Sequence, residues 1–241
     1  MTGPVLAAIA DPCPHEDPDD PAQVLAMPVV LRIERGQPPA RTALLAAAAS
    51  AALAVCLDPR AGLGEDGEPG PWHAPVLAWC SGRIRKVSRR ARGAHWVAVG
   101  ELAGVTVEVS GAQARALLPV AVGETSSLVR RLQISGTELE PDEPAAVPEH
   151  VPVLWLDAGL KMTVGKAAAQ VGHATMLLAA SLEAADLEAW RAAGWACAVR
   201  DAGSGPFARE RARPGAVVVR DAGYTEVPAG SATVVTRWPQ R

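Results

Sequence analysis

The sequence has few of the residues that build metal sites, disulfide frameworks and membrane spans. Its four cysteines have no C-x-x-C spacing and lie in unrelated contexts, which indicates reduced thiols. The longest apolar run, residues 43–57, is dominated by alanine and interrupted by Ser50, so it is too weakly hydrophobic to cross a bilayer. Residues 1–27 have no basic stretch followed by an apolar core, so we expect no signal peptide, no membrane partner and a cytoplasmic protein. The cysteines are Cys13, Cys56, Cys80 and Cys197.

Motifs for several enzyme chemistries are also absent. No G-x-S-x-G segment occurs, which excludes a serine hydrolase with that nucleophile turn. Gly159, Gly165 and Lys166 suggest a phosphate-binding loop, but the spacing is one residue too long and Ala167 replaces the hydroxyl needed for magnesium. Four weak metal ligands lie in a proline-rich N-terminal segment without supporting partners, so we expect neither a metal nor a cofactor. These ligands are Asp11, Cys13, His15 and Glu16.

The 23 basic and 26 acidic side chains are unevenly distributed. Residues 2–26 contain five acids and no lysine or arginine, and residues 138–150 contain five more acids among three prolines. Both compositions are typical of chain that does not pack, so we expect a mobile tail over residues 1–26 and a linker over residues 138–150. The remaining body is basic, which suits a polyanionic partner.

The segments on either side of the linker, residues 27–137 and 151–241, look alike. Each begins with a strand candidate followed by a helix candidate. The strand candidates are residues 28–34 and 151–157, and the helix candidates are residues 40–57 and 165–182. Further along, three pairs align with one residue of slippage: Trp79 with Trp190, Gly82 with Gly194, and Gly104 with Gly215.

This likeness predicts a degenerate internal duplication. We expect an α/β protein of two tandem small three-layer α/β/α domains, each with a mixed sheet, packed as a pseudo-dimer within a monomeric chain. The alternative is two unrelated α/β units that share an alanine-rich composition.

Two segments of the second half carry the strongest functional signal. The first, GKAAAQVGHA at residues 165–174, places Lys166 at the start of an alanine-rich helix. The second, VVVRDAGYTEVPAGSAT at residues 217–233, places Asp221 and Thr225 just beyond valines that predict a buried strand. An amine, a carboxylate and hydroxyls therefore gather at one edge of a sheet. Taken singly, Lys166 could be a surface lysine and Asp221 a turn cap. We expect that replacing either one barely changes stability.

Together these segments resemble the type 2 peptidyl-tRNA hydrolase family, whose hallmark is a lysine-opened helix paired with a downstream DAG-x-T turn. The resemblance covers roughly residues 151–236. It implies that the second half hydrolyses the ester of peptidyl-tRNA without a metal, releasing the peptide and recycling the tRNA. The catalytic residues that it implies are Lys166, Asp221, Thr225 and Thr233.

The resemblance also implies roles for these residues. Lys166 would stabilise the oxyanion or the leaving oxygen, while Asp221 would orient or deprotonate a water that the threonines position. Further residues expected to contact the substrate are Lys161, Gln170 and His173. For His173 a packed or hydrogen-bonded histidine is the alternative.

Three positions depart from the family pattern. Gly159 replaces an aspartate, Val164 replaces a lysine and Tyr224 replaces a basic residue. Two cationic contacts to RNA are therefore missing. The alternative function is a catalytically inactive RNA-binding or scaffold protein that retains the hydrolase fold.

The first half lacks the site but is rich in arginine. Ala43, Ser110 and Ala114 stand at the positions of the catalytic lysine, aspartate and threonine, so we expect a non-catalytic helper. Its basic segment, GRIRKVSRRARG at residues 82–93, predicts contact with tRNA phosphates or, alternatively, a solvated strand edge or helix face. Little aromatic interleaving occurs, so stacking of unpaired bases is not indicated. The basic residues are Arg83, Arg85, Lys86, Arg89, Arg90 and Arg92.

Overall fold

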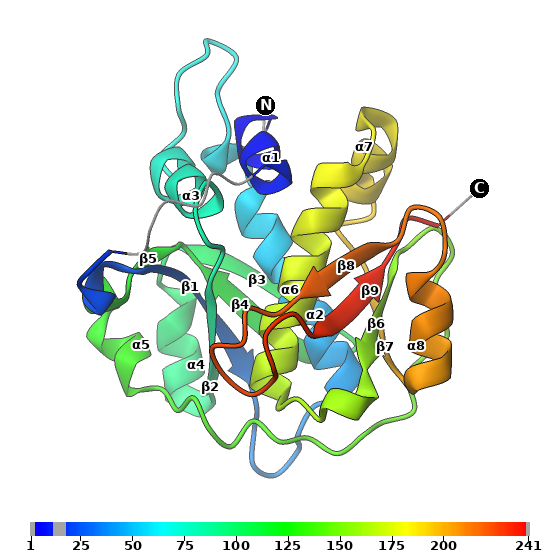
Figure 1. The fold of residues 1–241 in the computed structure, drawn as a ribbon. Helices are drawn as coiled ribbons and strands as arrows, with labels where there is room; N and C mark the ends of the chain where they lie inside the picture. Colours follow the sequence, from blue (N-terminus) through cyan, green and yellow to red (C-terminus); the bar gives the residue numbers. More distant parts are fainter. Residues whose placement is uncertain (1–2, 12–17, 240–241) are drawn as a thin grey trace.

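The computed structural model describes residues 3–11 and 18–239, which form two α/β units, each with its own sheet (Figure 1). The first unit contains α1 (Gly3–Ala10), β1 (Leu25–Arg32), α2 (Arg41–Cys56), α3 (His73–Cys80), β2 (Lys86–Ala91), α4 (Gly93–Gly100), β3 (Gly104–Val109), β4 (Ala112–Leu117), β5 (Val120–Ala121) and α5 (Ser127–Arg131). The second unit contains β6 (Val153–Asp157), α6 (Val164–Ser181), α7 (Ala184–Ala192), β7 (Ala198–Ala202), α8 (Ser204–Arg211), β8 (Val217–Arg220) and β9 (Ala232–Thr236). Short 3₁₀ helices are η1 (Pro21–Gln23), η2 (Pro59–Ala61), η3 (Val122–Glu124) and η4 (Ala158–Leu160).

The two sheets have the same topology. Their strand orders are β2-β1-β4-β3, with β5 added beside β1, and β7-β6-β9-β8. In each unit the first strand pairs in parallel with one neighbour and antiparallel with the other, and the last two strands pair antiparallel. Both sheets are therefore mixed, as the sequence predicts, and the repeat seen in the sequence has a topological counterpart.

A pair of tryptophans shows the same repeat at atomic detail. Trp79 in α3 and Trp190 in α7 are 1% and 0% exposed. Each indole N–H donates to a backbone carbonyl six residues further along, at Arg85 (3.0 Å) and Ala196 (2.8 Å). A buried indole needs such a partner. The two helices are therefore fixed to the following strand in the same way.

Helices cover both faces of each sheet. In the first unit α2 lies against β3 and β4, and α4 and α5 enclose a second apolar cluster on the other face. In the second unit α6 lies against β8 and β9, while α8 covers the other face. Because α2 and α6 also pack on each other, the two sheets enclose a central layer of two helices.

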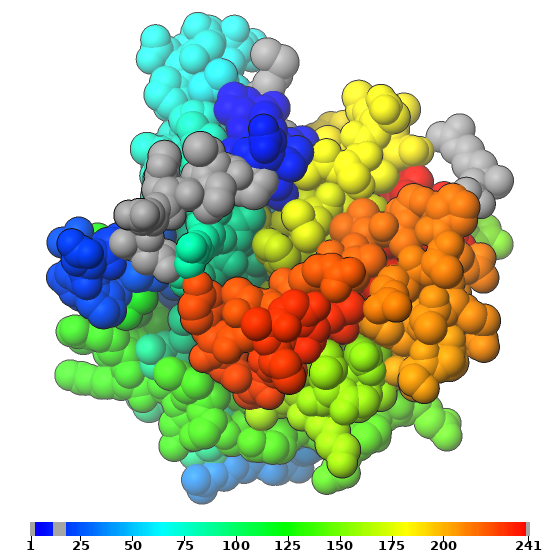
Figure 2. Space-filling model, in the orientation of Figure 1, coloured from blue at the N-terminus to red at the C-terminus, as the bar shows by residue number. Residues whose placement is uncertain are grey.

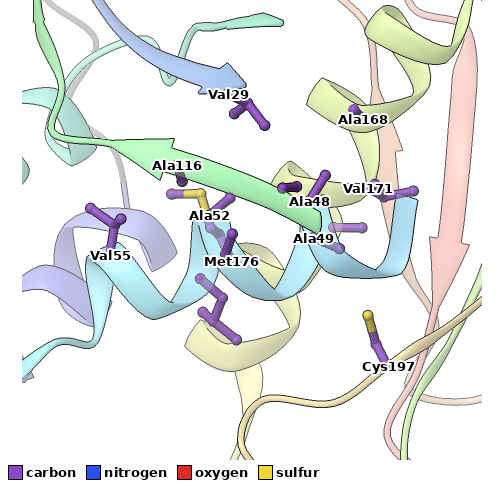
Figure 3. Packing of buried hydrophobic residues seen from close by; sticks show 14 of the residues in the cluster. Val29, Ala48, Ala49, Ala52, Val55, Ala116, Ala168, Val171, Met176 and Cys197 are labelled. Carbon is purple, nitrogen blue, oxygen red and sulfur yellow. The ribbon is translucent and has the colours of Figure 1, made fainter. Parts of the chain in front are cut away.

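Alanine makes the contact between α2 and α6 close. Alanine is the best helix former, and a helix that is apolar all round is one that becomes buried. Figure 3 shows Ala48, Ala49 and Ala52 of α2 beside Val171 and Met176 of α6. The approach is tight enough that a Cβ on Gly172 would lie 3.0 Å from the Cβ of Ala52.

Buried polar groups cross between the units. The Thr175 hydroxyl donates to the Ala49 carbonyl (3.1 Å), and the Ser50 hydroxyl donates to the Trp195 carbonyl (2.8 Å). Burial leaves such groups costly unless they are paired. The first bond links α6 to α2, and the second links α2 to the segment that follows α7.

The N-terminal segment departs from the expected tail over residues 1–26. Residues 3–10 form α1, which buries Val5 and Ile9 against α3 and α6, and β1 already begins at Leu25. The expectation is wrong for these residues because the acids all follow the apolar stretch of α1. The average composition of residues 1–26 does not reveal this short apolar helix. Glu16 and Asp17 lie outside the described residues.

The acidic linker has no helix or strand but does contact the first unit. The Asp142 carboxylate accepts hydrogen bonds from the Thr42 backbone N–H (3.1 Å) and hydroxyl (2.7 Å) at the start of α2. A carboxylate at this end complements the free N–H groups of a helix. Residues 138–150 therefore connect the units and also cap a central helix.

Three of the four cysteines lie among the described residues, and all three are in the protein interior. Cys56, Cys80 and Cys197 are buried free thiols, as predicted, and burial raises the pKa of Cys197 to about 12. Among the described residues, none of the helices has the length and apolar character needed to cross a membrane. Three residues of the weak N-terminal ligand set, Cys13, His15 and Glu16, lie outside the described ranges.

Candidate active site

The start of α6 meets the loop between β8 and β9, residues 221–231, at one edge of the second sheet. Thr163 precedes the helix, and its hydroxyl oxygen accepts the backbone N–H of Lys166 (3.1 Å). Glu226 of the loop accepts the backbone N–H (2.8 Å) and the hydroxyl (2.7 Å) of Thr163. The loop is therefore tied to the residue that caps the helix.

Lys166 and Asp221 form an ion pair at this junction. The Lys166 Nζ lies 2.6 Å from Asp221 Oδ2 and 2.8 Å from the Thr225 hydroxyl oxygen. The side chains of the pair are only 11% and 7% exposed. The carboxylate offsets the unfavourable placement of a cation in the first turn of a helix.

Gln170, one turn further along α6, extends this network. Its Nε2 donates to Asp221 Oδ2 (2.9 Å), and its Oε1 accepts from the Thr233 hydroxyl (2.5 Å). An ionised carboxylate can only accept hydrogen bonds, so the amide nitrogen must face Asp221 and the amide oxygen must face Thr233. Thr233 is fully buried, so it acts on the site only through Gln170.

The backbone of the loop closes on Asp221. The Asp221 N–H donates to the Ser231 carbonyl (3.0 Å), and the Asp221 carbonyl accepts from Gly230 (2.7 Å). Its Oδ1 accepts the Gly223 N–H (2.8 Å), so the turn-cap role is present alongside the ion pair. Gly223 has φ +83°, and a Cβ there would lie 2.6 Å from the Cβ of Ala229, so only glycine fits.

The equivalent position in the first unit is a tight turn. Ser110 (φ +48°) and Gly111 (φ +80°) join β3 directly to β4, where Val109 pairs with Ala112. Two positive φ values are the geometry of a two-residue hairpin. The candidate site therefore occupies a loop that exists only in the second unit, and Ser110 has no neighbouring loop to work with.

The network has limited remaining capacity for hydrogen bonds. Lys166 uses two of its three ammonium hydrogens on Asp221 and Thr225, and Asp221 uses three of about four acceptor positions. Within the part of the chain that the structure describes, the ion pair itself keeps one donor on Lys166 and one acceptor position on Asp221, and the Thr225 hydroxyl keeps its own hydrogen. That combination can hold one electronegative substrate oxygen and orient one water.

Two predicted substrate residues lie apart from this network. His173 is half-buried with an inaccessible Nδ1 that has no partner among the described residues. Burial, reinforced by the charge of Lys86, lowers the pKa of His173 to about 3. The packed alternative therefore describes this histidine. Lys161 is exposed, with φ +47°, in the connection that precedes α6.

The six basic residues of the segment 82–93 do not share one surface. The guanidinium of Arg89 donates to the carbonyl of Leu132 (2.9 Å), and that of Arg90 to the carbonyl of Gly136 (2.7 Å). The Lys86 Nζ is buried over the Trp79 ring, 5.1 Å from its centroid, and burial lowers the pKa of Lys86 to about 8.

The other three basic residues lie differently. Arg92 has an inaccessible guanidinium nitrogen without a partner among the described residues. Arg83 and Arg85 instead reach the second unit, where both approach Tyr224. The six basic side chains are close in the sequence, but in the fold they face different parts of the protein.

Several residues that contact the site were not predicted from the two motif segments. Thr163 lies three residues before Lys166, a spacing typical of a helix cap, so it could have been found from the sequence. Ser88 and Thr137 of the first unit hold Gly165, through hydrogen bonds of 2.6 Å to its carbonyl and 3.2 Å from its N–H. Neither these contacts nor that of Glu226 leave a local sequence signal.

No metal centre is formed by residues 3–11 and 18–239, where no three histidine, cysteine, aspartate or glutamate side chains gather closely enough to hold an ion. A scan against protein-family models and searches of curated proteins and of solved structures found no match. The two motif segments therefore carry the family resemblance alone.

Proposed function

We propose that the second unit hydrolyses the ester bond of peptidyl-tRNA, releasing the peptide and recycling the tRNA. The observation that carries the proposal is the contact of Lys166 with both Asp221 and Thr225, residues of the two motif segments. An ammonium that can stabilise an oxyanion and a carboxylate that can orient or deprotonate water are groups that metal-free ester hydrolysis can use.

The roles follow from the donors and acceptors that the network leaves. The remaining N–H of Lys166 would hold the ester carbonyl oxygen and stabilise the negative charge that develops on it. The remaining acceptor position of Asp221 would orient the attacking water. The water oxygen would bond to the ester carbonyl carbon and the bond from that carbon to the ribose oxygen would break. The ribose oxygen would take up one proton of the water, and the other would pass to solvent as the peptide carboxylate forms. Thr225 sits beside the ammonium, while Thr233 and Gln170 position the carboxylate.

The second candidate, an inactive RNA-binding or scaffold protein, is favoured by one observation. Lys166 and Asp221 neutralise each other directly, with little exposed area. Such a pair could serve only to hold the loop against α6. Tyr224, in place of a basic residue, agrees with this reading.

One assay separates the two functions. The purified protein should release peptide from N-blocked aminoacyl-tRNA in the presence of a metal chelator. Lys166→Ala should slow this release by about 10²-fold or more, whereas Arg211→Gln, at an exposed position in α8, should not change it. A folded protein that binds tRNA but releases no peptide at any concentration would establish the inactive alternative.

A further inference from the structure

Tyr224, the only tyrosine of the chain, lies exposed at the edge of the candidate site. It directly precedes Thr225, whose hydroxyl contacts the ammonium of Lys166. The residue stands on the 221–231 loop and is 63% exposed. Figure 2 shows this loop, in orange-red, on the surface beside the teal segment of the first unit.

Two arginines of the first unit meet this ring. The Arg83 guanidinium donates to the Tyr224 hydroxyl (2.6 Å). The Arg85 guanidinium carbon lies 5.5 Å from the centroid of the ring, within the range of a cation–π contact. Both arginines come from the connection between α3 and β2, on the other unit of the protein.

The basic segment has few aromatic residues of its own, and the fold brings the Tyr224 ring next to it. An exposed aromatic ring beside guanidinium groups is the combination that binds unpaired nucleotides, since bases stack on the ring and phosphates pair with the cations. A duplex hides the faces of its bases, so this arrangement suits a single strand better than a double helix.

We propose that Tyr224, Arg83 and Arg85 form a subsite for the unpaired nucleotides at the 3′ end of the RNA. A base stacks on the Tyr224 ring, and the two guanidiniums hold the phosphates that follow. The assignment of the 3′ end rests on the proposed function, because that end carries the ester. The first unit then takes part in substrate binding, and its cations replace the basic residue missing at position 224.

Binding of a short RNA tests this subsite independently of catalysis. The probe is a fluorescently labelled tetranucleotide with the 3′ sequence of tRNA, titrated with the full-length protein. Tyr224→Leu should weaken binding about 5- to 150-fold, because stacking of one base on an aromatic ring is worth about 1–3 kcal/mol. Tyr224→Phe, the matched control, keeps the ring and should retain most of the affinity.

The arginines are tested by salt dependence. Arg83→Gln and Arg85→Gln should each weaken binding and reduce the slope of log affinity against log salt by about 0.7, the value for one phosphate contact on a single strand. Arg211→Gln should leave the slope unchanged. A blunt RNA duplex should compete poorly with the tetranucleotide.

The outcomes separate this subsite from the proposed function. If Tyr224→Leu binds the tetranucleotide as tightly as the parent, or if the duplex competes equally well, the subsite is overturned whatever the hydrolysis assay gives. If the tetranucleotide binds through Tyr224 but no peptide is released from peptidyl-tRNA, the subsite stands and the hydrolase proposal fails.

Discussion

Lys166 and Asp221 lie where little water reaches them, which changes the effect of removing either one. With side chains 11% and 7% exposed, each charge depends on the other for compensation. The sequence alone predicts that loss of either one barely changes stability. Their burial predicts a larger effect.

We expect Lys166→Ala and Asp221→Asn each to lower ester hydrolysis by about 10²-fold or more, since a preorganised electrostatic group typically contributes about 3–4 kcal/mol to the barrier. Each should also lower the free energy of unfolding by about 3–5 kcal/mol, because a buried charge is left unpaired. Single-turnover rates of the folded protein and urea unfolding measure the two effects. Parental turnover by either variant would remove that residue from the site.

A double replacement separates chemistry from stability. Lys166→Met combined with Asp221→Leu removes both charges, so most of the lost stability should return while hydrolysis stays absent. Glu188→Gln is the matched control for an ion pair, because Glu188 and Arg191 are more than half exposed and solvent screens their attraction, so its loss should hardly change stability.

His173 should make the stability depend on pH. Burial and the charge of Lys86 lower its pKa to about 3, whereas the unfolded chain titrates near its ordinary value of 6.5. The unfolded state therefore binds the proton first, and the folded protein loses stability as the pH falls through this window, by up to about 1.4 kcal/mol per pH unit. Urea unfolding at about pH 7.5, 6 and 5 should show a shallower decline for His173→Gln. Identical declines in the two proteins would assign the acid sensitivity to other groups.

At the scale of the elements, the approach of α6 to α2 leaves no room for one methyl group at Gly172. A Cβ there would meet the Cβ of Ala52 at 3.0 Å and the Cε of Lys86 at 3.3 Å. The lysine can move, but the alanine is fixed to the backbone of α2. Gly172→Ala gains about 1 kcal/mol of helix propensity and should lose about 1–3 kcal/mol to overpacking. Thermal unfolding should show a net loss.

The matched control for this substitution is Gly205→Ala in α8. There the nearest atom to a Cβ is the end of the Arg209 side chain at 4.0 Å, so no clash occurs. Stability should stay unchanged or rise by less than about 1 kcal/mol. If Gly172→Ala were as stable as Gly205→Ala, the helices would have more freedom to separate than the structure shows.

The central elements are predictable because their signals are local. The sequence predicts helices over residues 40–57 and 165–182, and the structure has them at Arg41–Cys56 and Val164–Ser181. The mixed sheets are also confirmed. Helix α1 is missed because its short apolar stretch lies within an acidic segment.

The site is predictable only in part, because its contacts are distant in sequence. Lys166 and Asp221 are 55 residues apart, and only the paired motif brings them together before the structure is seen. Charge density cannot show which arginines face the protein, so Arg89 and Arg90 look like phosphate ligands although they hold backbone carbonyls. Glu226 and Tyr224 gain their partners only when the loop closes.

For the whole molecule, the packing of the central helices indicates that no second copy of the chain is needed to cover their apolar faces. α2 and α6 cover each other between the sheets, so the apolar face that each unit would expose alone is buried within the chain. We expect a monomer by sedimentation across micromolar concentrations, in line with an internal pseudo-dimer. A tight homodimer would contradict the pseudo-dimer arrangement while leaving the assignment of Lys166 and Asp221 untouched.

The seam between the two central helices also restricts how the halves can diverge. A larger side chain at Ala52 would need a smaller residue opposite it on α6. The residue opposite is Gly172, which already has no side chain. The hydroxyl of Thr175 likewise depends on the main chain at Ala49. The first half has Ala43, Ser110 and Ala114 at the positions aligned with Lys166, Asp221 and Thr225, yet its residues on this face of α2 are restricted by packing. Relatives of this chain should therefore change together at these positions, so that a substitution in one helix restricts which residues the other helix can accept.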